Sequence, residues 1–226
     1  MKYAVTFFVW ISFVLLSSNL GAQETGNDDP SVTTSLGIPI SAPLSPISRQ
    51  LAGAWGVSSE IGYNFDRKNA LIGEFMWNSL YPTNEALQPI RVALQSPHVN
   101  GHGNLFALTS EYRFELRGRS LGVYFIGGGG LYYRSASLSK PVPTGTTITC
   151  DPAWIWWGFS CTVGVVTNNA TIASSSTRAF GANGGVGLTI RVGEAPYRFF
   201  AESRYHFAPT KNVTTQLIVV TFGIRY

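Results

Sequence analysis

Residues 217–226 read LIVVTFGIRY and end a segment, 214–226, in which two kinds of side chain alternate. Thr221, Gly223 and Arg225 are small or polar. The alternate positions are apolar or aromatic, namely Ile218, Val220, Phe222, Ile224 and Tyr226. Because successive side chains of a strand point to opposite faces, this period of two predicts a β-strand with one apolar face.

The same alternation recurs upstream, in segments that are long for strands. In 104–116 the apolar Phe106 and Leu108 lie on one face, and Glu111 and Arg113 lie on the other. Ordinary strands have about five or six residues, whereas these segments have 11 to 15. The chain is therefore predicted to be all-β. The other segments are 52–65, 70–81, 121–134, 178–192 and 197–207.

The connections between these segments alternate in length. Long loops at 82–103 and 135–177 interleave with short turns at 66–69, 117–120 and 193–196. Short turns on one side and long loops on the other are typical of an outer-membrane barrel. Such a barrel needs an even number of strands, so we expect an eighth strand at 32–42, where Pro39 predicts an irregularity.

The apolar face is predicted to meet lipid, and the polar face to line the lumen. None of the strand segments carries a lysine, and charged residues make up 12% of the chain, too few to cover a soluble surface. Aromatic residues gather at both ends of the apolar face, as in membrane barrels. A soluble, lipocalin-like barrel is the alternative. The polar face carries the predicted lumen charge network: Glu60, Glu74, Glu111, Arg113, Glu115, Arg134, Arg191, Arg198, Glu202, Arg204 and Arg225.

Several segments carry a resemblance to a known family. The ending LIVVTFGIRY, GGGGLYY at 127–133, GGVGLTIRV at 184–192 and FFAESRYH at 199–206 resemble the bacterial outer-membrane β-barrel domain family, which includes the small OmpA/OmpX-type barrels. The resemblance covers about residues 31–226. It implies a transmembrane antiparallel up-and-down β-barrel of eight strands in the bacterial outer membrane.

The resemblance also implies partners. Phe222, Ile224 and Tyr226 match the C-terminal assembly signal, which implies contact with the barrel-assembly machinery during biogenesis. Outer-membrane lipid and lipopolysaccharide are the implied surroundings. The chain departs from the family pattern in two ways: no periplasmic peptidoglycan-binding domain follows the barrel, and the third outer loop, 135–177, is long.

The first 22 residues have the pattern of a signal peptide. Lys2 supplies a positive charge, 4–16 is an apolar run of 13 residues, and Leu-Gly-Ala at 20–22 is a small-residue cleavage context. A bilayer needs about 20 apolar residues, so a retained anchor is the less favoured alternative. Residues 23–30 are predicted to form a polar leader before the barrel at 31–226.

Composition argues against nucleic-acid binding. The formal net charge is +4, from 16 Lys and Arg against 12 Asp and Glu, but the lysines do not cluster and the arginines are scattered. Phosphate recognition requires a basic patch, and none can be found in the sequence. No nucleic-acid partner is therefore expected. No cofactor and no metal are expected either.

The long loop 135–177 carries both cysteines and a group of aromatic residues, and its part 163–177 is expected either to be mobile or to form a hairpin that extends beyond the membrane. Cys150 and Cys161 are predicted to form a disulfide, because an oxidising compartment favours one. A metal site is the weaker alternative, since no histidine is near. Between the cysteines an aromatic knob is predicted, either packed on the rim or lipid or recognising an external ligand. The knob consists of Trp154, Trp156, Trp157 and Phe159.

These features predict a non-catalytic protein with a structural or surface-interaction role. One alternative is a small gated pore for ions or small solutes, which opens when an ion pair of the lumen breaks. The simpler interpretation of the charged residues is a sealed lumen, because the interior of an eight-stranded barrel is just wide enough for side chains to fill it. A second alternative is a lipid-modifying enzyme, as in lipid A deacylase barrels. His206 would then need a serine, but Phe207 and Ala208 follow it.

Overall fold

The computed structural model describes residues 31–154, 158–193, 195–210 and 214–226. The predicted signal peptide and polar leader lie outside these residues. The described part is dominated by eight strands, which are listed here with their bounds: β1 (Val32–Pro43), β2 (Ala54–Asn64), β3 (Asn69–Leu80), β4 (Asn100–Arg117), β5 (Leu121–Trp154), β6 (Gly158–Arg191), β7 (Arg198–Ala208) and β8 (Thr215–Arg225).

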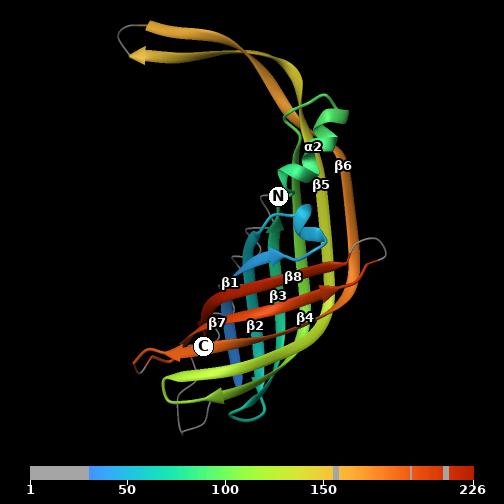
Figure 1. Cartoon of the computed structure of the whole chain (residues 1–226). Helices are drawn as coiled ribbons and strands as arrows, with labels where there is room; N and C mark the ends of the chain where they lie inside the picture. Colours follow the sequence, from blue (N-terminus) through green and yellow to red (C-terminus); the bar gives the residue numbers. More distant parts are fainter. Residues whose placement is uncertain (1–30, 155–157, 194, 211–213) are drawn as a thin grey trace. The chain divides into compact units, whose positions relative to one another are not determined.

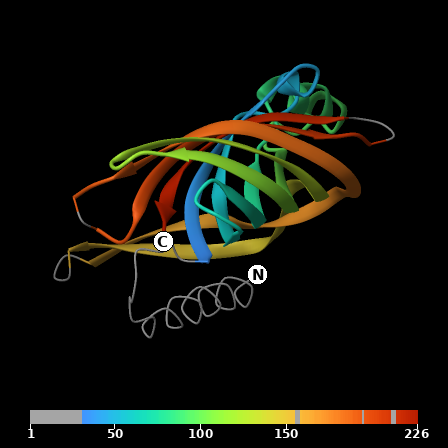
Figure 2. The same ribbon diagram turned by 90° about the horizontal axis from the view of Figure 1, so that it is seen from below.

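The eight strands form one closed antiparallel barrel in the order of the sequence (Figures 1 and 2). Each strand pairs with the next, and β1 closes the ring on β8, with Leu36 opposite Ile224. The predicted eight-stranded up-and-down barrel is therefore confirmed. The eighth strand expected at 32–42 is β1, and the proline at position 39 pairs within it opposite Thr221.

The three short turns join β2 to β3, β4 to β5 and β6 to β7, all at the end of the barrel that holds Tyr226. The β2–β3 turn is closed by Asp66, whose side chain accepts hydrogen bonds from the Lys68 amide (2.6 Å), the Asn69 amide (2.8 Å) and the Asn69 side chain (2.7 Å). These bonds hold the pKa of Asp66 below its usual value. We call this end the inner end, because short turns face the periplasm in outer-membrane barrels.

The outer connections contain two helices that the alternation does not predict. A 3-10 helix, η1 (Ile47–Arg49), lies between β1 and β2, and α2 (Asn84–Ala93) lies within the loop expected at 82–103. Thr83 caps α2 by accepting a hydrogen bond from the Ala86 amide at 3.2 Å. Among the described residues, no helix is long and apolar enough to cross a bilayer.

The long outer connection predicted at 135–177 takes the form of a hairpin, because β5 and β6 continue through it as paired strands (Figure 1). The two strands pair with each other from Leu121 and Ile190 to Trp154 and Gly158. β4 pairs with β5 no farther than Ser139, and β7 pairs with β6 no farther than Ala182. The rest of the hairpin extends past the neighbouring strands. Its Thr- and Val-rich sequence favours strands, which explains the hairpin.

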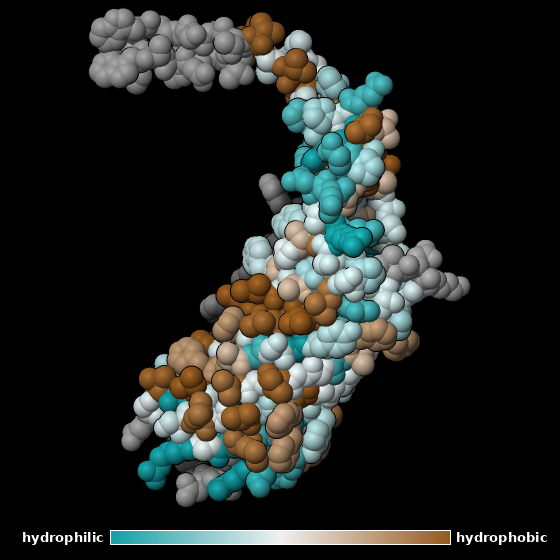
Figure 3. Space-filling model, viewed as in Figure 1, coloured by the Kyte–Doolittle hydropathy of each residue, from teal (hydrophilic) through white to brown (hydrophobic). Residues whose placement is uncertain are grey.

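The outer surface of the barrel is apolar, as Figure 3 shows in brown. Large apolar side chains on alternate positions of every strand are exposed, including Ile38 (58%) and Trp55 (57%). Aromatic pairs lie at both ends of this surface. Tyr197 and Tyr226 have ring centroids 6.0 Å apart at the inner end, and Phe106 and Tyr133 have centroids 6.2 Å apart toward the outer end. This arrangement is that of a protein that spans a membrane.

Candidate functional site: the charged interior

The centre of the lumen is built around one guanidinium. Arg204 on β7 contacts carboxylates from four strands: Glu60 on β2, Glu74 on β3, Glu111 on β4 and Glu202 on β7. The nitrogen–oxygen distances are 2.5, 2.8, 2.7 and 2.5 Å, respectively. All five side chains are buried, so these are charge-assisted contacts in a region shielded from water.

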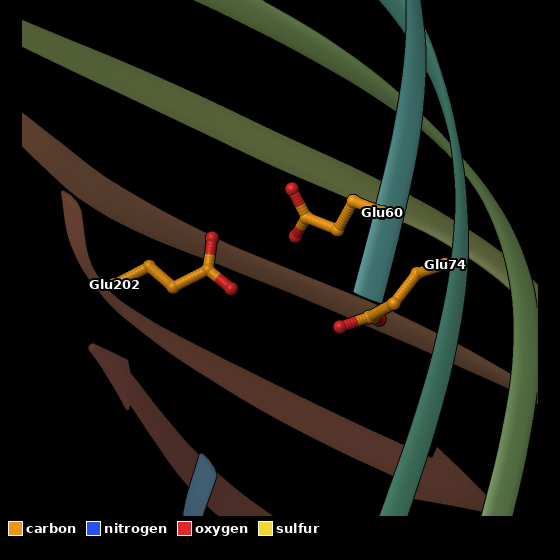
Figure 4. Close-up of side chains that lie close together, drawn as sticks. All are labelled: Glu60, Glu74 and Glu202. Atoms are coloured by element: carbon orange, nitrogen blue, oxygen red, sulfur yellow. The ribbon is translucent and has the colours of Figure 1, made fainter. Parts of the chain in front are cut away.

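Three of these carboxylates point toward a common space, as Figure 4 shows for Glu60, Glu74 and Glu202. Their oxygens lie within 4.8 Å of one another, which is close enough for shared cation ligands. The guanidinium of Arg204 lies within 2.8 Å of each carboxylate, however. The cluster therefore fits an arginine-centred ion-pair network, and it does not fit an open metal site.

A second centre lies toward the inner end, around Arg225 on β8. Its guanidinium nitrogens lie 3.8 Å from Glu60 and 3.7 Å from Glu115, and Arg113 also lies 3.7 Å from Glu115. The guanidinium carbon is 4.9 Å from the centroid of the Tyr124 ring, which is a cation–π distance. Glu60 thus connects the two centres into one network.

Neutral side chains complete the network, and the list of charged residues drawn from the sequence missed them. The Tyr124 hydroxyl donates to Glu202 at 2.8 Å, the Asn183 amide to Glu111 at 2.6 Å, and the Thr189 hydroxyl to Glu115 at 3.0 Å. Each of these residues is on the charged face of its strand, so the alternation could have found them. Arg117, assigned to a turn, also joins by donating to Glu115 at 3.1 Å.

The other predicted network residues lie nearer the barrel ends. Arg134 is partly buried and donates to the Thr215 hydroxyl at 3.0 Å. Arg198 is partly buried at the inner end. Placing Arg191 in the lumen network is wrong, because it is exposed and donates to the Ala195 carbonyl at 3.0 Å. Arg191 is the last residue of β6, so its side chain lies beside the turn that follows the strand and not inside the barrel.

An apolar cluster lies in the interior toward the outer end. It includes Ile47 of η1, which is 2% exposed. The connection between β1 and β2 thus contributes a buried side chain to the interior. The other buried members are Ala54, Met76, Leu80, Leu105, Ala107, Tyr132, Ala208, Leu217 and Val219.

His206 lies between the charged centre and this apolar cluster. It is 1% exposed, and its Nδ1 lies 2.9 Å from the Tyr132 hydroxyl, with which it shares a hydrogen bond. The nearest charged group on its own strand is Arg204. This environment is that of a buried structural histidine, with a tyrosine rather than a serine as its partner.

Residues 155–157 at the hairpin tip lie outside the described residues, and around them, at 149–154 and 158–162, only the backbone is described. Nothing is described of the aromatic side chains predicted as a knob, Trp154, Trp156, Trp157 and Phe159, or of the cysteine side chains. The backbone places Cys150 directly opposite Cys161 in the ladder. Directly paired positions bring Cα atoms to about 4.5–5.5 Å, within the range that a disulfide spans, so the disulfide stays a prediction with suitable backbone placement.

The C-terminal residues predicted as an assembly signal lie on the lipid-facing surface. Phe222 and Tyr226 are exposed and Ile224 is partly exposed. Phe222 and Ile224 are on β8, the strand that closes the barrel on β1, and Tyr226 directly follows it. Recognition by the assembly machinery stays a prediction.

No protein-family model and no curated protein matches the sequence, whereas solved structures match the fold. A major outer membrane protein from Thermus thermophilus matches with a TM-score of 0.51 at 7% identity, covering 87% of this chain and 99% of that one. Ail, the attachment invasion locus protein of Yersinia pestis, gives 0.46 at 15% identity, covering 86% and 97%. Neisserial surface protein A gives 0.45 at 14% identity, covering 87% and 96%.

At such identities the likeness concerns the fold. The Thermus protein is an outer-membrane protein by description, and this chain adds the apolar outer surface and charged interior of a membrane-spanning barrel. The expected resemblance to small outer-membrane barrels and the expected location are thereby confirmed. The chain has the fold of the small bacterial outer-membrane β-barrels, and its eight antiparallel strands span that membrane.

Proposed function

We propose that this protein is a non-catalytic outer-membrane barrel whose sealed body presents the β5–β6 hairpin for surface interaction. The observation that carries the proposal is the hairpin itself, since β5 and β6 each have 34 residues whereas β7 and β8 have 11. A hairpin isolated in water is marginally stable, so a long one implies a use outside the membrane. Loops and extensions on rigid scaffolds commonly carry binding functions.

The surface of the hairpin supports a contact role. Ile148 on β5 lies opposite Val163 on β6, and these side chains are 68% and 75% exposed. Val165, the next residue on the same face of β6, is 63% exposed. Apolar side chains gathered on a projecting ribbon favour burial against a partner. The proposal includes an external ligand that binds to this hairpin. It also includes contact between the base of the hairpin and lipopolysaccharide.

The hairpin can be tested without disturbing the barrel. We expect a variant in which 141–169 is replaced by Asn-Gly to fold and to keep its heat-dependent gel mobility, because the barrel ladder is left intact. Cells that make the shortened protein should clump and sediment less than cells that make the full chain. They should also be retained less on collagen-coated surfaces. Equal retention by both cell types would contradict the surface role.

A small gated pore is the second candidate, and unpaired groups in the lumen favour it. Arg204 Nε and both terminal nitrogens of Arg225 lack hydrogen-bond partners although they are buried. Buried donors without partners are costly, so water entry would stabilise them. Conductance of the refolded protein in planar bilayers separates the candidates. We expect no ion conductance from a sealed lumen, whereas reproducible conductance steps would favour the pore.

The lipid-modifying alternative is less well supported, because His206 is buried and bonded to Tyr132. An enzyme acting on lipid needs a nucleophile and a base that lipid can reach. We therefore expect cells that make the protein to keep an unchanged lipid A profile by mass spectrometry. Loss of acyl chains would contradict the non-catalytic assignment.

A further inference from the structure

The inner end of the barrel carries an arc of positive charge that neither the lumen nor the hairpin explains. Four exposed cations lie in or beside the three short turns: Arg67, Lys68, Arg119 and Arg191. Arg117 and Arg198 are partly buried beside them. Hydrophilic residues at this end appear in teal below the brown band in Figure 3.

Backbone hydrogen bonds join the three turns into one continuous surface. The Glu115 amide donates to the Lys68 carbonyl at 2.7 Å, which connects the first turn to the end of β4. The Arg191 amide donates to the Ser120 carbonyl at 2.8 Å, which connects the second turn to the end of β6. The cations therefore form an arc along neighbouring strands rather than separate single charges.

Few negative charges balance the arc. Asp66 is the exposed carboxylate among the described residues of these turns, and its oxygens already accept three hydrogen bonds within its own turn. Glu115 is 2% exposed and contacts Arg113 and Arg117. Glu194 of the third turn lies outside the described residues. Among the described residues of these turns, exposed cations therefore outnumber exposed carboxylates.

The position of the arc, next to the end of the lipid-facing surface, indicates what kind of partner it can bind. Phe65, Leu116 and Leu121, which flank the cations, are exposed and end the lipid-facing band. Cations just beyond such a band lie at the level of lipid headgroups. The turns have three to six residues, so their charges stay close to the bilayer surface and do not reach far into the periplasm.

We propose that this inner-end arc is a binding site for anionic phospholipid headgroups of the inner leaflet. Lysine and arginine side chains near a membrane surface attract acidic lipids, and each cation strengthens this attraction several-fold. Guanidiniums also bind phosphate in a bidentate way.

The test compares phosphatidylglycerol with phosphatidylcholine on the folded, detergent-solubilised protein by native mass spectrometry. The inner variant R67Q/K68Q/R119Q removes three charges from the arc. The control variant R49Q/K140Q/R178Q removes three charges from the outer connections and the hairpin. We expect the wild-type protein and the control variant to bind phosphatidylglycerol about tenfold more tightly than phosphatidylcholine. The inner variant should bind the two lipids with equal affinity.

Several outcomes overturn the proposal. These are equal binding of both lipids by the wild-type protein, an inner variant that keeps its preference, and an equal loss in the control. Displacement of bound phosphatidylglycerol by soluble polyglutamate at equal charge would indicate a site for a soluble polyanion instead. Heat-dependent gel mobility verifies folding. If the triple variant fails to fold, the single variants K68Q and R119Q replace it, each with an expected partial loss.

Discussion

Replacing Arg204 by methionine tests how much the guanidinium at the centre of the ion-pair network contributes to the stability of the barrel. The change leaves four buried carboxylates, from Glu60, Glu74, Glu111 and Glu202, without the cation that contacts each of them at 2.5–2.8 Å. Breaking a buried ion pair by removing one partner costs about 3–5 kcal/mol, because the remaining charge stays buried. Since Arg204 serves four carboxylates, we expect a loss near the upper end, about 5 kcal/mol in the free energy of unfolding.

The assay is urea unfolding of protein refolded in phosphatidylcholine vesicles, followed by tryptophan fluorescence and gel mobility. Arg178→Met is the matched control. Arg178 is exposed and lies 5.7 Å from the centroid of the Tyr133 ring, so its removal should cost about 1 kcal/mol or less. The comparison separates loss of the network from loss of an arginine in general.

A second variant supplies the decisive result. Adding Glu74→Gln and Glu111→Gln to Arg204→Met removes two of the uncompensated charges and should recover a large part of the lost stability. A loss below about 1 kcal/mol for Arg204→Met alone would refute the reasoning, because the carboxylates would then tolerate the missing cation. An equal loss in the variant with glutamines would show that packing, not charge, sets the effect.

Three further predictions concern glycine packing, a turn and the hairpin. Gly187→Ala places a Cβ about 2.2 Å from the buried Tyr124 ring and should destabilise the barrel by about 1–3 kcal/mol in urea unfolding, whereas Gly184→Ala, whose Cβ would have 3.8 Å to its nearest neighbour, should be nearly neutral. Asp66→Ala should lower stability at neutral pH, because hydrogen bonds lower the pKa of the folded carboxylate; its difference from wild type should shrink as pH falls below about 3.8, the ordinary value, and a pH-independent difference would contradict this. The two cysteines of the hairpin should resist alkylation until reduced, as intact mass measures; free thiols before reduction would contradict the disulfide.

The sequence predicted the barrel because a strict period of two is hard to satisfy in another fold. Seven alternating segments and the parity of an up-and-down barrel led to β1, even though Pro39 interrupts the pattern. α2 was missed because Pro89 lies inside it and because it is short, although Leu87, Ile90 and Leu94 follow a helical spacing. The sequence left 163–177 open between a mobile segment and a hairpin, because its threonines and valines favour strands whereas its asparagines do not.

The candidate site could be predicted as a set of residues but not as a set of contacts. Alternation assigns Glu60 and Arg204 to the lumen face of their strands, but these strands are not neighbours in the ring, and the two residues are 144 positions apart in sequence. Which lumen side chains meet depends on strand tilt and stagger. These quantities come from the full ring of pairings, so no single segment contains them. Arg191 was misplaced for the complementary reason, since alternation does not say where a strand leaves the barrel.

The lumen can hold so many large polar groups because part of its wall has no side chains. Gly128 lies against Glu111, Gly185 against Arg204 and Gly187 against the Tyr124 ring, and a Cβ at each position would come within 2.9 Å of those side chains. All three glycines are on β5 and β6, the strands that continue into the hairpin. The network therefore packs directly against the barrel part of the two strands that continue into the hairpin.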